Sequence, residues 1–204
     1  MRRIEKSPEP AALVAHREHG GSYDSLHRAD IRPQLLEDQR GLCCYCLKRL
    51  KDRPGQIKVE HFRPQHRHPE LELSWHNLFA ACRGGMGQPP AQQHCDTAKG
   101  GQRCDLDPLT VREADFRYHA DGRISHQDPE LDRQLNEVLH LNTPAIRRRR
   151  QATLDGFIRA MSQRKGTWPR AVLERELTRR LEKNPLDPYC MVIAGWLRRK
   201  LRQR

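Results

Sequence analysis

The sequence lacks any apolar run that approaches the roughly 20 residues needed to cross a lipid bilayer. Its opening residues, Met1 to Lys6, also lack the apolar core of a secretory signal peptide. No lipidation signal and no internal repeat are present, which excludes a lipid-anchored protein and a repeat array. We therefore expect a cytoplasmic protein with no membrane partner, in which cysteines stay reduced.

Acidic residues are few relative to basic ones. The 204 residues include 38 Lys and Arg but only 26 Asp and Glu, giving a formal net charge of +12 and a pI of about 9.8. A field of this sign attracts polyanions, because each neutralised phosphate releases counterions. Charge alone therefore favours nucleic acid as the partner over the alternatives of plain solubility or a membrane surface.

Apolar residues are also scarce, at 36% of the chain against 31% charged residues. This apolar fraction is well above that of a disordered chain but allows only a small hydrophobic core. Such a core fits one domain or a small catalytic module with helical flanks. Between residues 41 and 110, cysteine, histidine, glycine and proline concentrate while apolar periodicity fades. Such a composition is typical of a module in which a bound metal replaces much of the apolar core.

We expect an α+β fold that is mainly helical and divides into four regions. These are an N-terminal lead-in and helix (1–40), a metal-organised module (41–110), a hairpin or linker (111–128) and a C-terminal helical region (129–204).

Local signals predict the elements within these regions. Residues 1–20 should be an extended lead-in with one short turn, and a helix should follow between Asp24 and Gln39. Asp121-Gly122 predicts the turn of a hairpin. Thr143 and Pro144 predict the cap and first position of a long helix, with other helices from 129, over 169–183 and from 188 onward.

Seven cysteines in a reducing compartment indicate metal ligation rather than disulfide bonding. Cys43 and Cys46 form a CxxC knuckle, and Cys82 and Cys95 are the natural second pair. Four thiolates in a tetrahedral arrangement bind Zn²⁺ tightly, and two separated pairs staple the chain between them. A thioredoxin-like redox pair would need a βαβ context, which is missing here. The sequence therefore predicts a structural zinc site.

The second cysteine pair departs from the two-residue spacing of a knuckle. Cys82 and Cys95 are separated by twelve residues, so a loop rich in glycine and proline must be looped out, and Cys104 stays open as the fourth ligand. Register favours Cys95, because a zinc ligand there leaves Asp96 free to face a catalytic ion. Cys104 lies beyond Gly100-Gly101, where a short helix should already have ended.

Residues suited to phosphodiester hydrolysis lie between and beside the two halves of this cysteine frame. Glu60 precedes His61, Asn77 follows, and Asp96 comes directly after the last cysteine. Hydrolysis needs a base that deprotonates water and a hard cation that neutralises the phosphate and the departing oxygen. Glu60 and Asp96 offer oxygen ligands, which favour Mg²⁺ or Mn²⁺ over softer metals. On an extended strand, the side chains of Glu60 and His61 should point to opposite faces.

The same residues resemble the HNH endonucleases. The resemblance rests on Cys43, Cys46, Glu60-His61, Asn77-Leu78, Cys82, Cys95-Asp96 and Lys99, with Glu-His in place of the first His pair and Cys-Asp in place of the final His. Over about its first two-thirds the chain also resembles the HNH proteins of Septu-type and retron-associated anti-phage systems. The segments concerned are Met1 to Arg17 with Lys6-Ser7-Pro8-Glu9-Pro10, Gly41-Leu42-Cys43, Glu60-His61-Phe62-Arg63-Pro64, His94-Cys95-Asp96-Thr97 and Leu139-His140-Leu141-Asn142.

This resemblance implies a zinc-stapled ββα-metal module with helical flanks. It implies that His61 is the general base and that Glu60 and Asp96 hold the catalytic Mg²⁺ or Mn²⁺. It further implies that Asn77 fixes the loop linking the two strands, and it makes Lys99 a candidate phosphate contact. The function implied is a metal-dependent endonuclease that cuts nucleic acid, with DNA favoured over RNA, as the effector of a bacterial defence system working with a partner ATPase.

One alternative stays open at this point. The chain would then be a non-catalytic, zinc-organised subunit for nucleic-acid binding or assembly. The presence of Glu60, His61 and Asp96 together argues against that alternative, since loss of any one of them would have favoured it.

Overall fold

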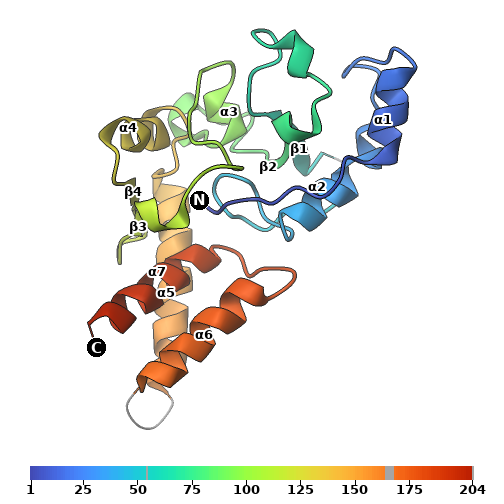
Figure 1. Ribbon diagram of the computed structural model, residues 1–204. Coiled ribbons are helices and arrows are strands. Elements are labelled where there is room, and N and C mark those ends of the chain that lie inside the picture. Colours follow the sequence, from blue (N-terminus) through green and yellow to red (C-terminus); the bar gives the residue numbers. More distant parts are fainter. Residues whose placement is uncertain (54, 164–167, 204) are drawn as a thin grey trace.

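The structure is a computed structural model that describes residues 1–53, 55–163 and 168–203 (Figure 1). Its α-helices are α1 (Ala11–Glu18), α2 (Arg32–Asp38), α3 (Asp96–Lys99), α4 (Pro129–Glu137), α5 (Pro144–Ser162), α6 (Arg170–Glu182) and α7 (Cys190–Arg202). Its strands are β1 (Ile57–His61), β2 (Leu78–Cys82), β3 (Phe116–Tyr118) and β4 (Ile124–His126). The expected α+β class is therefore confirmed. Within the described ranges, no helix combines the length and apolar character that crossing a membrane requires.

Strands β1 and β2 form an antiparallel pair that carries the central module. Glu60 pairs with Phe79 and His61 pairs with Leu78, and all five residues of β2 are buried. Helix α2 docks beside β2 through Gln39, whose amide accepts from the Ala80 N–H and donates to the Ala80 carbonyl, both at 2.7 Å. This buried amide satisfies backbone groups that the two-stranded sheet leaves unpaired, and so attaches the helix to the strand at a fixed position.

The N-terminal segment differs from the extended lead-in expected over residues 1–20. Helix α1 occupies Ala11–Glu18 and begins directly after Pro10. Alanine has the highest helix propensity, and two alanines start the helix while Leu13 buries itself completely. The helix expected between Asp24 and Gln39 is shorter than that span, since a 3₁₀ turn at Arg28–Asp30 precedes α2.

The C-terminal helices and the second hairpin follow the sequence signals closely. Helix α5 begins at Pro144 after Thr143, and β3 and β4 turn around Gly122. Gly122 has φ +79°, and a Cβ there would lie 2.1 Å from the Arg147 carbonyl oxygen of α5, so a side chain is excluded. Helices α6 and α7 lie side by side, and α7 also contacts α5 and β3 (Figure 1).

The buried core is continuous from Met1 through the central module to Leu197 of α7. The four region boundaries expected from composition stay predictions, because helices and hairpins from different regions share this core.

Candidate metal centre and acidic cleft

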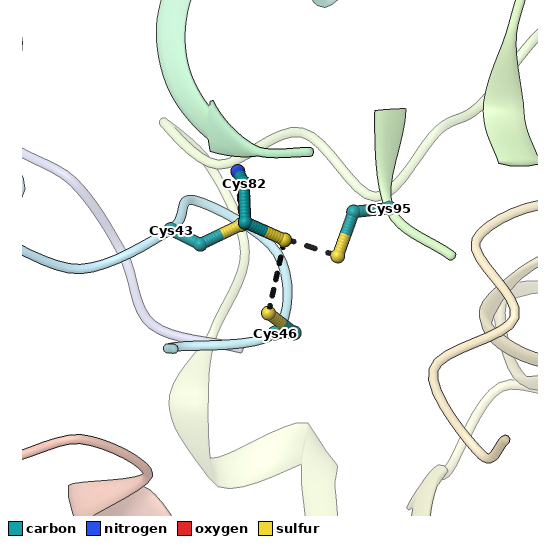
Figure 2. A group of neighbouring side chains, drawn as sticks. All are labelled: Cys43, Cys46, Cys82 and Cys95. Carbon is teal, nitrogen blue, oxygen red and sulfur yellow. Dashed lines mark hydrogen bonds between the residues drawn. The ribbon is translucent and has the colours of Figure 1, made fainter. Parts of the chain in front are cut away.

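The cysteine cluster, defined as Cys43, Cys46, Cys82 and Cys95, joins three separate parts of the chain (Figure 2). A tight turn after α2 presents the first two thiols, closed by hydrogen bonds from the Cys43 N–H to the Lys48 carbonyl and from the Leu47 N–H to the Cys43 carbonyl. The third thiol ends β2 and the fourth immediately precedes α3.

The spacing of the four thiols matches a tetrahedral metal site. All four are buried, and their sulfur atoms lie within 4.8 Å of one another. The Cys43–Cys95 and Cys46–Cys82 sulfur distances are 3.9 and 3.7 Å. Four sulfurs each about 2.3 Å from a zinc ion would be separated by about 3.8 Å. The cluster could therefore hold a structural metal such as zinc.

Of the two candidates for the fourth thiol, the structure brings Cys95 into the cluster and leaves Cys104 outside it. Burial raises the pKa of the Cys104 thiol to about 11, which keeps it protonated. The twelve-residue gap before Cys95 is closed by a hydrogen bond from the His94 N–H to the Gly84 carbonyl, at 2.8 Å. A Cβ on Gly84 would lie 2.0 Å from the His94 carbonyl oxygen, so this close backbone contact requires glycine.

Glu60 and Asp96 come together from β1 and α3. Glu60 is 2% exposed; its Oε1 accepts from the Tyr45 hydroxyl at 2.7 Å and pairs with Lys99 Nζ at 2.7 Å. Asp96 pairs with Lys58. Burial and a hydrogen bond with the Asp96 carboxyl raise the pKa of Glu60 well above its usual value. Burial opposes ionisation of Asp96 too, but hydrogen bonds with Glu60 and Lys58 hold its pKa below the usual value.

The proximity of the two carboxyl groups disfavours ionisation of both at once, because adjacent like charges repel each other. A hard divalent cation removes that penalty, and paired carboxylate oxygens are the ligands that Mg²⁺ and Mn²⁺ prefer. The donor set of Glu60 and Asp96 therefore fits such an ion.

His61 is half-buried and its ring orientation is fixed on two sides. Nε2 lies 2.9 Å from the Glu72 carbonyl oxygen, and the edge of the Tyr23 ring packs against the imidazole with 4.3 Å between centroids. A carbonyl oxygen only accepts, so Nε2 carries the hydrogen and Nδ1 keeps a free lone pair. Burial lowers the pKa of His61, which keeps the imidazole neutral and able to accept a proton.

Asn77 holds the loop between the two strands. Its side-chain oxygen accepts from the Arg63 N–H at 2.7 Å, and its amide donates to the Arg63 and Leu71 carbonyls at 3.1 Å. Since Asn77 is itself buried, these bonds fix the position of the segment from which Glu72 reaches His61.

Lys99 lies away from the surface on which a phosphate contact was expected. Its side chain is 1% exposed and its Nζ donates to the His61 carbonyl oxygen at 3.0 Å as well as pairing with Glu60. The ion pair with a buried carboxylate draws the lysine inward, because an unpaired buried carboxylate is costly. The cation that lines the cleft is Lys58 instead.

An acidic cleft of about 750 Å³ brings these groups to one surface. Its wall includes Glu60 and His61 from β1, Asp96 from α3, and the 64–72 segment. A proton acceptor and two metal-type ligands thus line one cavity. The expected placement of Glu60 and His61 on opposite faces does not keep them apart, because His61 is the last residue of β1 and both residues line this cleft.

The chain is similar to the Septu protein PtuB of Bacillus thuringiensis. The two are 28% identical over 120 residues, which make up 55% of this chain and 41% of PtuB, so the matched region spans less than half of that relative. No family model matches the chain. The similarity to PtuB agrees with the resemblance to Septu-type proteins that the sequence motifs indicate.

Three further residues of the site escaped the sequence reasoning. Lys58 stands two positions before Glu60, and the period of two along a strand places it on the same face, so this signal was present. Tyr45 lies inside the CxxC knuckle, yet nothing in the sequence links it to Glu60. Tyr23 contacts His61 only through the tertiary fold.

Proposed function

We propose that the protein is a metal-dependent HNH-type endonuclease that hydrolyses phosphodiester bonds of nucleic acid, with DNA favoured over RNA. The observation that carries this proposal is the arrangement of one cleft: His61 with a free Nδ1 lies beside the carboxyl pair of Glu60 and Asp96. The net charge of +12 supports a polyanionic substrate.

In this proposal His61 acts as the general base. Nδ1 accepts the proton of the attacking water, while the Glu72 carbonyl holds the Nε2 hydrogen and so keeps the ring from turning. Burial keeps the imidazole neutral before the reaction. The Tyr23 ring restricts the imidazole on its other side.

Glu60 and Asp96 would hold Mg²⁺ or Mn²⁺, which when bound stabilises negative charge on the phosphate and the leaving oxygen. For this both carboxyl groups must be ionised, and Lys99 stabilises the ionised form of Glu60. Zn²⁺ in the cysteine cluster would have a structural role, because it anchors the residue directly before Asp96.

The similarity to PtuB supports a role as the effector of a Septu-type anti-phage system that works with a partner ATPase in the bacterial cytoplasm. One observation favours a second function, a non-catalytic zinc-organised subunit for nucleic-acid binding or assembly. Glu60 already has two partners, Lys99 and Tyr45, and so resembles a structural carboxylate.

A cleavage assay separates these functions. The zinc-loaded protein, alone and with its partner ATPase, is incubated with plasmid DNA and with RNA, with and without added Mg²⁺. We expect Mg²⁺-dependent cutting that His61→Ala reduces by on the order of 10² to 10⁴ with an unchanged melting temperature. His76→Ala, which removes an exposed histidine outside the acidic cleft, serves as the matched control. Cutting by His61→Ala at the wild-type rate would refute the assignment, and binding without cutting would favour the second function.

A further inference from the structure

A second cavity, of about 530 Å³, lies at the N-terminal end of α5. We call it the α5 cavity. Its wall comes from the turn that carries Cys43 and Cys46, the loop before Cys95, the first turns of α5, and Tyr189. Its charged lining is entirely basic: the residues around it include Lys48, Arg148 and Arg149 and no Asp or Glu. None of these three cations forms an ion pair with a carboxylate in the described part of the chain.

Thr143, which lines the α5 cavity, occupies the N-cap position of α5 but does not cap it. A threonine there usually accepts a hydrogen bond from one of the first helical N–H groups. Here the side chain makes no such bond, the residue is only 9% exposed, and the hydroxyl oxygen has no hydrogen-bond partner. A buried hydroxyl without a partner is costly, which points to a ligand that completes it.

The backbone at this helix end is also unsatisfied. Pro144 has no N–H, and the N–H groups of Ala145 and Ile146 make no hydrogen bond to another described residue. Helix α5 is 19 residues long, so the partial positive charge at its N-terminus is fully developed. Free amides, a free hydroxyl and unpaired cations therefore face one cavity, and all of them donate hydrogen bonds.

We propose that the α5 cavity binds a phosphate group. The Thr143 hydroxyl and the amides of Ala145 and Ile146 would donate to its oxygens, and Lys48 and Arg148 would neutralise its charge. A tetrahedral oxyanion suits a set made only of donors, whereas a neutral or cationic ligand would leave these groups unmatched.

The phosphate has two possible sources with the same chemistry: a backbone phosphate of a polynucleotide, or a free phosphate such as that of a mononucleotide. His94 lines the α5 cavity and Asp96 lines the acidic cleft, so the two cavities are linked along the chain through Cys95. If the source is a polynucleotide, one strand would contact both cavities. This extension to a substrate strand rests on the proposed nuclease function, while phosphate binding itself does not.

Binding measurements on the zinc-loaded full chain, without added Mg²⁺ and at constant ionic strength, test the proposal. The probes are inorganic phosphate and AMP by calorimetry, and a fluorescein-labelled 12-nucleotide single-stranded DNA by anisotropy. The variants are Thr143→Val and Arg148→Gln. Arg159→Gln is the charge-matched control, since Arg159 is exposed on the same helix and lies outside the α5 cavity.

We expect Thr143→Val and Arg148→Gln each to weaken binding about tenfold, the loss expected for a hydrogen bond to a charged group. Arg159→Gln should change affinity less than about twofold, because Arg159 lies outside the α5 cavity. The melting temperature of Thr143→Val should stay level or rise, because its hydroxyl makes no bond in the unliganded protein. If the two variants bind all three probes more weakly, the cavity is a site for free phosphate. If they bind only the oligonucleotide more weakly, it is a site for a backbone phosphate. Both results support the proposal.

Three results would overturn it. They are no binding of any probe, binding that falls no further in Arg148→Gln than in Arg159→Gln, and a lower melting temperature of Thr143→Val with unchanged affinity. Since no cleavage is measured, failure of the nuclease proposal leaves this test intact.

Discussion

Replacing Lys99 by methionine tests whether this lysine is a buried ion-pair partner or a surface phosphate contact. The side chains of Lys99 and Glu60 are 1% and 2% exposed. Among the described residues, the Glu60 carboxyl group also accepts a hydrogen bond from the Tyr45 hydroxyl and contacts Asp96. Removing one partner of a buried pair costs about 3–5 kcal/mol while the other group stays ionised and buried. For a chain of this size we expect the melting temperature to fall by roughly 6–20 °C.

The loss should depend on pH, and its sign follows from proton linkage. The folded-state pKa of Glu60 is already raised, and removal of Lys99 takes away a cation that lowers it. Between the unfolded and folded pKa values the folded variant holds the extra proton, so its stability falls as pH rises through this window. Urea unfolding at pH 5.5 and pH 8.0 should therefore show a larger difference from wild type at pH 8.0.

Lys58→Met is the matched control. Its pair with Asp96 is 29% and 14% exposed, so we expect a cost of about 1 kcal/mol or less. Equal losses for Lys99→Met and Lys58→Met, with no pH dependence, would refute the buried pair and return Lys99 to the cleft surface.

Three further predictions concern the metal centre, the loop and the base. The Cys46→Ser variant should lose bound zinc and unfold without cooperativity, whereas the Cys104→Ser variant should keep its zinc and unfold cooperatively. Zinc content is measured by mass spectrometry, and loss of zinc from Cys104→Ser would contradict the assignment of the four ligands. Asn77→Ala should cost about 2–3 kcal/mol in urea unfolding, because it breaks three partly buried hydrogen bonds of the loop. The same change at the exposed Asn136 should cost under about 0.5 kcal/mol. If His61 is the base, the acid limb of the pH profile of kcat/KM should give an apparent pKa below the ordinary histidine value of about 6.5. The reason is that burial lowers the pKa of His61 and the neutral form is the active one. An apparent pKa above that value would argue against His61.

Local signals predicted those parts of the fold that short-range chemistry determines. The CxxC spacing was enough to predict that Cys43 and Cys46 belong to one metal site, and Thr143-Pro144 was enough to place the start of α5. The turn at Gly122 followed in the same way from its own two residues. Each of these depends on a few neighbouring residues, so no tertiary information was needed.

The features that sequence reasoning missed depend on contacts between distant segments. Lys99 is four residues from Cys95, and the family resemblance made it a candidate phosphate contact, which would require a surface position. Its actual position depends on Glu60, 39 residues earlier, and on the His61 carbonyl. The unsatisfied hydroxyl of Thr143 is equally invisible in the sequence, because an N-cap threonine ordinarily bonds to its own helix.

The connection between the cysteine cluster and the acidic cleft depends on the backbone of one residue. Cys95 adopts φ +58°, which is unfavourable for a side-chain-bearing residue, and its N–H donates to the Leu139 carbonyl at 2.8 Å. The conformation costs about 1–3 kcal/mol, whereas structural zinc in small domains binds with on the order of 10 kcal/mol. With zinc bound as proposed, the metal can hold this strained residue, so that its thiol joins the cluster while Asp96 lines the cleft. Leu139 belongs to the segment Leu139-His140-Leu141-Asn142, which lies outside the central module but is one of the segments that resemble Septu-type proteins. Its hydrogen bond to Cys95 gives this segment a physical role, because Cys95 links the cysteine cluster to the acidic cleft.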